Sequence, residues 1–304
     1  MQTAAAPAYP AELIAVLIAV TAGEPRILTV QAGCALPSGP FELGHKSLQS
    51  SLRAWVEQQT HHPLGYVEQL YTFADRAGAA VSPHAISISY LGLTQEGRAS
   101  GGYDAAWQGW YDYFPWEDQR AGPPPLLTGV AAGLQDWAGA ARGPAASTDR
   151  RQRVAITFGL DGHAWNEELV LQRYELLYEA GLVPESPQSG QQLAPGRSMA
   201  LDHRRIAATG IARLRAKIKY RPVVFELLPP EFTLLHLQRT VEGIAGRLLH
   251  KQNFRRLVEQ QDLVEDTGAI SSGTGGRPAK LFRFRRAVLS ERAVAGTKLP
   301  LSRP

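Results

Sequence analysis

The sequence predicts an α/β (α+β) sandwich followed by a smaller, mostly α-helical domain. First, a chain of 304 residues is longer than one core usually organises, which favours two domains. Second, strand-like and helix-like apolar patterns are mixed before residue 183. Third, residues 197–304 carry 21 Lys and Arg against 9 Asp and Glu, whereas residues 1–196 carry 11 against 19. A compact basic domain most often binds a polyanion such as nucleic acid, and a solvated basic face is the alternative.

The first strong element is the apolar run "LIAVLIAV", Leu13 to Val20, which we interpret as a buried strand. Eight residues are too few to span a bilayer, and no basic residue precedes them, as a secretory signal would need. A Gly-Glu-Pro turn at Gly23 leads to a second apolar run, which predicts a β-hairpin. The single cysteine, Cys34, cannot form an internal disulfide, and this favours a reducing, cytoplasmic location.

Strands and helices then alternate up to a segment without apolar periodicity, "PESPQSGQQLAPG". Its Pro, Ser, Gly and Gln content is typical of a linker or a long surface loop. We therefore predict a first domain over 1–183, a linker over 184–196 and a second domain over 197–304. The elements predicted in between are helices over 48–59, 128–143 and 164–182 and strands over 66–73 and 84–94, the last helix being ended by Gly181.

The second domain carries a helix-turn-helix pattern. Thr233 is a suitable N-cap for an apolar-striped helix over 234–245, which Gly246 closes. A short turn leads to a second, basic helix over 251–261, and two strands around the loop 269–278 form a wing. Solvated charge is the alternative for these cations. The residues predicted to bind DNA are Lys251, Gln252, Asn253, Arg255, Arg256, Arg277 and Lys280.

The helix over 48–59 follows a Gly/Pro loop and resembles the Nudix box. That box has a Gly, five residues, a Glu, seven residues, and then Arg-Glu-hydrophobic-any-Glu-Glu-any-Gly. Gly39, Arg53, Trp55 and Glu57 match the pattern, but His45, Ala54 and Gln58 stand where it has glutamates, and Thr60 replaces the last Gly. Nudix hydrolases hold Mg²⁺ or Mn²⁺ through clustered carboxylates, and one Glu cannot form such a cluster. We therefore expect no catalytic residues and no metal site.

The degenerate box together with the basic C-terminal segment resembles the Nudix-related transcriptional regulators, the NrtR- and NadQ-like family. The stretch 65–94, which follows the box, and the C-terminal stretch 201–285 carry this resemblance. It implies a repressor of NAD biosynthesis genes that binds double-stranded operator DNA. Because one helix-turn-helix reads only a few base pairs, we expect a homodimer. The resemblance also implies a nucleotide effector, which is ATP, NAD(H) or ADP-ribose. The long chain and the eroded box are more similar to the alphaproteobacterial regulators than to the ADP-ribose-responsive branch.

Other interpretations remain open. An active Nudix-type hydrolase would need an unusual carboxylate set drawn from Glu42, Glu57 and Glu68, and an RNA-binding or protein-interaction module is a further alternative. The segment 101–120 contains three Trp, three Tyr and one Phe, which form either a ring-stacking site or, as we expect, core or interface. We interpret His61, His62 and His84 as surface or structural residues rather than metal ligands.

Overall fold

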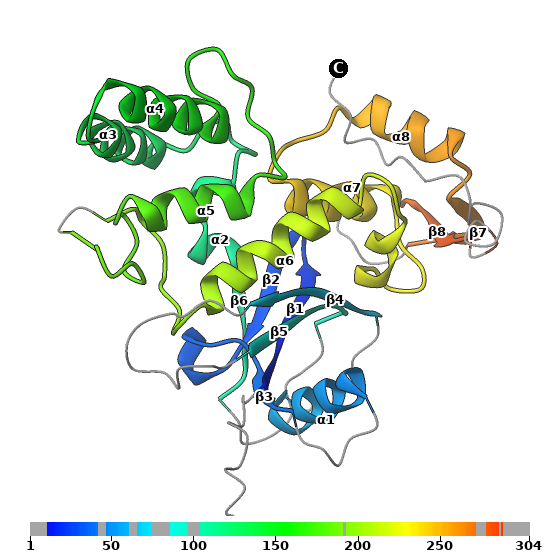
Figure 1. The fold of residues 1–304 in the computed structure, drawn as a ribbon. Helices are drawn as coiled ribbons and strands as arrows, with labels where there is room; N and C mark the ends of the chain where they lie inside the picture. Colours follow the sequence, from blue (N-terminus) through cyan, green and yellow to red (C-terminus); the bar gives the residue numbers. More distant parts are fainter. Residues whose placement is uncertain are drawn as a thin grey trace, which may run out of the picture.

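The computed structural model describes residues 11–41, 47–60, 66–73, 86–96, 104–190, 193–271, 278–285 and 287. A six-stranded mixed sheet forms the middle layer of the N-terminal part of the fold (Figure 1), between α1 (Leu48–Thr60) and α6 (His203–Lys217). Its strands are β1 (Ala11–Thr21), β2 (Glu24–Thr29), β3 (Ser38–Pro40), β4 (Tyr66–Phe73), β5 (Ile86–Leu93) and β6 (Ala106–Gly109). The order is β4-β5-β1-β2-β6, with β3 beside the first half of β1.

Strand β1 is the middle of the sheet, because it pairs in parallel with β5 on one side and antiparallel with β2 and β3 on the other. Every residue from Leu13 to Val20 is buried, as the continuous apolar run predicted. The predicted hairpin joins β1 to β2 through Ala22 and Gly23, both with positive φ. Two consecutive residues with positive φ match the twist of the flanking strands.

Alternate residues of β1 face two separate cores. Leu13, Ala15 and Leu17 pack against Leu52 and Val56 of helix α1 (Leu48–Thr60) on one face. On the other face lie Ile14, Val16 and Ile18, which pack in the core that contains α6 (His203–Lys217). Helix α6 approaches closely at Gly210, where a Cβ atom would lie 2.8 Å from Val16 Cγ1. The expected α/β sandwich is confirmed (Figure 1).

Further helices extend the α6 side of the sandwich. The short helix α2 (Trp110–Tyr113) and the 3₁₀ helix η2 (Pro115–Glu117) follow β6, and another 3₁₀ helix, η1 (Gln31–Gly33), follows β2. Helices α3 (Leu126–Gly139) and α4 (Pro144–Phe158) pack on each other, and α5 (Val170–Glu179) packs on α6. The helix predicted over 164–182 thus begins only at Val170, although it ends near Gly181 as expected.

The C-terminal elements form a winged helix. They are the 3₁₀ helix η3 (Val223–Leu227), α7 (Leu234–Ala245), α8 (Lys251–Gln260) and the wing strands β7 (Val264–Ile270) and β8 (Lys280–Phe284). The Thr233 hydroxyl accepts a hydrogen bond from the His236 amide at 3.1 Å, and Gly246 closes α7 with φ of 68°. Both predicted caps are confirmed. A bridge between Phe232 and Phe282 ties the start of α7 to the wing.

The described part of the predicted linker is mostly exposed, but it is anchored to the rest of the chain at a few positions. Ser186 and Ala194 are buried, and the Glu185 carboxylate accepts a hydrogen bond from the Met199 amide. Helix α6, which we had assigned to the second domain, packs on β1, β4 and β5. The domain limits 1–183 and 197–304 stay a prediction; we now propose that the boundary lies near residues 218–223. No helix in the described ranges is long and apolar enough to cross a membrane.

Candidate nucleic-acid interface and the buried charge cluster

Helix α8 has one apolar and one basic face. Phe254 and Val258 are buried and fix the helix on the C-terminal core. The predicted DNA-binding residues of this helix all lie on its exposed face: Lys251, Gln252, Asn253, Arg255 and Arg256. Among the described residues, the three cations of this face have no carboxylate partner. Their charge is therefore available to a polyanion.

The turn before α8 is held rigidly by two buried polar side chains of α7. The Glu242 carboxylate accepts hydrogen bonds from the Leu249 amide and from the Gln238 side chain, both at 2.9 Å. Gln238 also donates to the Leu249 carbonyl at 3.1 Å. Because Glu242 and Gln238 are buried, these bonds are shielded from water and set the entry angle of α8.

The cations of the wing are paired, in contrast to those of α8. Lys280 Nζ lies 2.8 Å from Asp266 Oδ2, and Arg283 pairs with Glu265 on the same hairpin. The hydrogen bond from Lys280 lowers the pKa of Asp266. Lys280 was predicted to bind DNA, and a DNA phosphate would have to share the Lys280 charge with Asp266. Arg277, also predicted, lies outside the described residues.

The degenerate box is partly assembled in space. Gly39 lies directly beneath the Trp55 ring, where a Cβ atom would come within 2.3 Å of Trp55 Cδ2, and the indole donates to the Pro40 carbonyl at 2.8 Å. The spacing of Gly and hydrophobic residue in the motif therefore corresponds to a packing contact. Arg53, Ala54, Glu57 and Gln58 lie on the exposed side of α1, and His45 lies outside the described residues.

The described carboxylates of the rival hydrolase set do not converge. Glu57 is exposed on α1, on one side of the sheet. Glu68 instead pairs with Lys217 of α6, on the other side, and accepts a hydrogen bond from Tyr66. Glu42 lies outside the described residues, as do His61, His62 and His84. Among the described residues, no three His, Cys, Asp or Glu side chains are placed to hold a metal ion.

The aromatic segment belongs to the core, as expected. Trp110, Tyr113, Phe114 and Trp116 are fully buried. What sequence reasoning missed is the residue that follows them, Glu117. Its carboxylate is also buried, so the segment inserts a negative charge into the apolar interior. A charge in such a place requires ionic partners.

Two arginines surround this carboxylate, and we call Glu117, Arg173 and Arg215 the buried charge cluster. Arg173 Nη2 lies 2.9 Å from Glu117 Oε2, and Arg215 Nη1 lies 2.5 Å from the same oxygen. Burial lowers the pKa of Arg173, and the Glu117 charge opposes this effect. Arg215 also donates to the carbonyl of Ile244 at 2.8 Å, in the last turn of α7.

Neighbouring bonds attach the same end of α7 to the aromatic segment. The Tyr111 hydroxyl donates to the Gly243 carbonyl at 2.6 Å, and the Gln119 amide donates to the Gly246 carbonyl at 2.7 Å. Gly246 packs against the backbone of Glu117, and a Cβ atom at position 246 would lie only 2.3 Å from the Glu117 carbonyl oxygen. The buried charge cluster therefore fastens the winged helix to the sandwich through backbone groups of α7.

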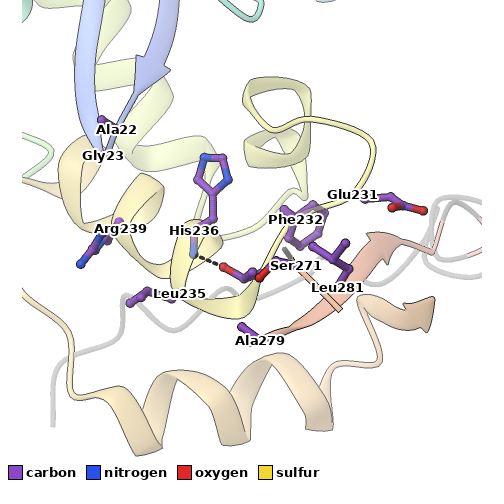
Figure 2. A pocket seen from close by; sticks show the side chains of 11 residues that line it. Ala22, Gly23, Glu231, Phe232, Leu235, His236, Arg239, Ser271, Ala279 and Leu281 are labelled. Carbon is purple, nitrogen blue, oxygen red and sulfur yellow. Dashed lines mark hydrogen bonds between the residues drawn. The ribbon is translucent and has the colours of Figure 1, made fainter. Parts of the chain in front are cut away.

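Two cavities lie away from these contacts. One of about 670 Å³ is bounded by the β1–β2 turn, the first turns of α7 and strand β8 (Figure 2). His236 and Arg239 line it, and burial, reinforced by Arg239, lowers the pKa of His236. The other, of about 370 Å³, is lined by Glu12, Asp104 and His203 among others. His203 Nδ1 accepts a hydrogen bond from the Leu36 amide at 2.8 Å. Burial lowers the pKa of His203 although the charge of Glu12 acts in the opposite direction, so the neutral imidazole is favoured.

Comparison with known proteins identifies the C-terminal part. Residues 224–284 match the NrtR DNA-binding winged helix domain. The chain carries an NrtR-type winged helix. This match begins after α6, which supports a domain boundary between α6 and η3. Over 86 residues, 28% of this chain, the sequence is 41% identical to the ADPR responsive transcriptional repressor NtrR of Acinetobacter baylyi. The match spans about a third of that relative's length (34%).

Solved structures extend the likeness to the whole fold. NrtR of Shewanella oneidensis matches with a TM-score of 0.56 at 20% identity, covering 92% of this chain and 96% of that one. The same protein complexed with a 27mer DNA gives 0.55 at 20% identity, over 92% and 95%. A MutT/nudix family protein from Enterococcus faecalis gives 0.54 at 15% identity, over 94% and 90%. By fold, the chain is therefore a Nudix-like domain joined to an NrtR-type winged helix.

Proposed function

We propose that this protein is a transcriptional repressor that binds double-stranded operator DNA through α8 and the wing. The observation that carries the proposal is the exposed face of α8, whose cations lack carboxylate partners in the described chain, on an NrtR-type winged helix. Recognition helices of this kind enter the major groove, where base edges present distinct donor and acceptor patterns. Asn253 and Arg256 are the residues we assign to base edges, and Lys251 and Arg255 to phosphates.

The protein acts as a homodimer on a pseudo-palindromic site. One helix-turn-helix reads only a few base pairs, so useful discrimination among genomic sites needs two copies with half-sites about one helical turn apart, or a multiple of that. The genes under control are those of NAD biosynthesis, as the resemblance to the regulator family implies.

The effector is a nucleotide, with ADP-ribose as the first candidate and ATP or NAD(H) as the others. Support for ADP-ribose comes from the Acinetobacter baylyi relative, an ADPR responsive repressor. The Nudix-like domain binds this effector without cutting it. Ala54 and Gln58 stand where the box has glutamates, and the described carboxylates Glu57 and Glu68 lie on opposite sides of the sheet.

The test is selection of duplex DNA from a random library by the full-length protein, followed by gel shifts on the selected duplex. Arg255→Ala should weaken binding to all sequences and flatten its salt dependence, whereas Arg256→Ala should weaken binding and relax the preference for particular base pairs. Arg151→Ala is the matched control, because Arg151 is also an exposed arginine and lies on α4. ADP-ribose, ATP and NADH are then titrated into the complex. Selection of RNA over duplex DNA, or Mn²⁺-dependent release of AMP, would establish one of the rival functions instead.

A further inference from the structure

Leu248 is the most exposed of the large apolar side chains that the structure leaves open to solvent, at 65% of its surface. It lies in the turn between α7 and α8, three residues before Lys251 begins the recognition helix. Ile270, the next at 61%, ends strand β7 of the wing. The two most exposed apolar residues thus both lie on the elements that contact DNA in winged-helix proteins.

The turn holds Leu248 in place without using its side chain. On one side, the Gly246 carbonyl accepts from the Gln119 amide at 2.7 Å. On the other, both backbone groups of Leu249 are bonded, its amide to Glu242 and its carbonyl to Gln238. Leu248 is therefore presented on a fixed backbone, so that its immobilisation on binding costs only the freedom of the side chain.

The exposed face of α8 offers only polar and charged contacts, from Lys251, Gln252, Asn253, Arg255 and Arg256. Hydrogen bonds and charges leave one feature of the major groove unread, which is the C5-methyl group of thymine. This methyl is the apolar group that distinguishes a T·A pair from its C·G counterpart at the same edge position. An apolar side chain beside the first turn of the recognition helix is suited to it.

We propose that Leu248 is a specificity-determining residue that packs against the C5-methyl group of one thymine in each operator half-site. This inference rests on the proposed DNA-binding function and adds a base preference to it. Removing one methyl contact costs about 0.8 kcal/mol, which corresponds to about fourfold in affinity for each half-site. The contact contributes specificity and leaves the salt dependence of binding unchanged, because it involves no phosphate.

The experiment combines protein and DNA changes in one cycle. The duplex selected by the wild-type protein is resynthesised with each thymine of one half-site replaced singly by deoxyuridine, which lacks only the methyl group. Wild type should lose about fourfold at one position. Leu248→Ala should bind the unmodified duplex more weakly and lose nothing further at that position, whereas Leu248→Met should retain most of the wild-type response.

Ile156→Ala supplies the matched control, since Ile156 is an exposed aliphatic residue on α4, 44% accessible and away from the winged helix. It should behave as wild type on every duplex. Circular dichroism should show equal melting for Leu248→Ala and wild type, because the side chain buries little surface.

Two results would overturn the inference while leaving the proposed function intact. One is a loss of affinity in Leu248→Ala that is equal on every duplex, including unselected sequence, since that would mean a backbone or structural role. The other is the absence of any deoxyuridine position at which the two proteins differ. Failure of the wild-type protein to select any duplex would instead defeat the DNA-binding proposal, and the inference with it.

Discussion

Replacing Glu117 by Gln should be among the most destabilising single changes in this protein. The substitution keeps the shape of the side chain, so its effect is electrostatic. Arg173 and Arg215 are both fully buried, and each would lose its anion. The Gln amide has one oxygen that can accept a hydrogen bond. Its NH₂ group is a donor and would face the N–H donors of the second guanidinium, so that no hydrogen bond forms there.

The magnitude follows from the burial of the three groups. Removing one partner of a buried ion pair typically costs about 3–5 kcal/mol, because the remaining charge is left uncompensated. Both arginines keep backbone acceptors, Arg173 at the carbonyls of Thr157 and Asn166 and Arg215 at that of Ile244. Their N–H groups are therefore largely satisfied and the loss stays within that range. Since whole domains are stable by only about 5–15 kcal/mol, the change is readily measured.

Urea denaturation of the full-length protein measures this cost. Glu179→Gln is the matched control, because Glu179 pairs with Arg153 at the surface, both about half exposed, and should cost no more than about 1 kcal/mol. Adding Arg173→Met to Glu117→Gln removes one orphaned cation and should restore part of the loss. A cost for Glu117→Gln no larger than that of the control, or purely additive costs in the double variant, would refute the role assigned to the cluster.

Four further outcomes are expected. Asn253→Ala and Arg256→Ala should each cost about 1–3 kcal/mol in operator binding and relax specificity at particular base pairs, as gel shifts on variant duplexes would show; Lys280→Ala should weaken all sequences alike, with a salt slope reduced by less than about one unit because Asp266 already shares its charge. Burial raises the pKa of Glu167, but the hydrogen bond from Lys219, a backbone hydrogen bond and the charges of Arg247 and Lys219 together hold it below its ordinary value of 4.5. The stability contributed by Glu167 is thus complete above about pH 4.5 and is lost as the pH falls through the folded pKa, so Glu167→Gln should flatten the unfolding profile only in that acidic range. Sedimentation at micromolar concentration should show a dimer, and a monomer with and without DNA would count against the proposed assembly.

The elements with strong local signals could be predicted from the sequence. Eight consecutive apolar residues specify β1 as a strand buried on both faces, and Thr233 and Gly246 specify the ends of α7 through backbone hydrogen bonds and a positive φ. Gly39 and Trp55 were paired by motif spacing alone, and the structure places one on the other. In each case the deciding interaction is made by neighbouring residues or follows a known pattern.

The buried charge cluster could not be predicted in the same way. Glu117 is separated in sequence from Arg173 by 56 residues and from Arg215 by 98. In the sequence, each of the three residues looks like an ordinary surface charge. An ionic contact between residues so far apart leaves no pattern in the residues around them. Helix α6 shows the same limit of local sequence signals. Its basic composition suggested the DNA-binding domain, while its buried side chains, among them Ile206 and Ile211, pack on the sandwich side.

The hydrogen bonds that attach the end of α7 to the sandwich limit how an effector could control operator binding. Arg215, Tyr111 and Gln119 each bond a backbone carbonyl in the last turn of α7 or at its cap, so turning α8 relative to the sheet would break several buried hydrogen bonds at once. Such a rearrangement costs more than the 1–3 kcal/mol that allosteric coupling typically supplies. We therefore expect the effector to change the placement of one subunit relative to the other, and with it the spacing of the two α8 helices, while each subunit moves as one body. An effector acts only through its differential affinity for the two arrangements, and operator DNA must then change effector affinity by the same factor. Calorimetric titration of ADP-ribose with and without the selected duplex tests this reciprocity, and equal affinities would show that the nucleotide does not regulate DNA binding.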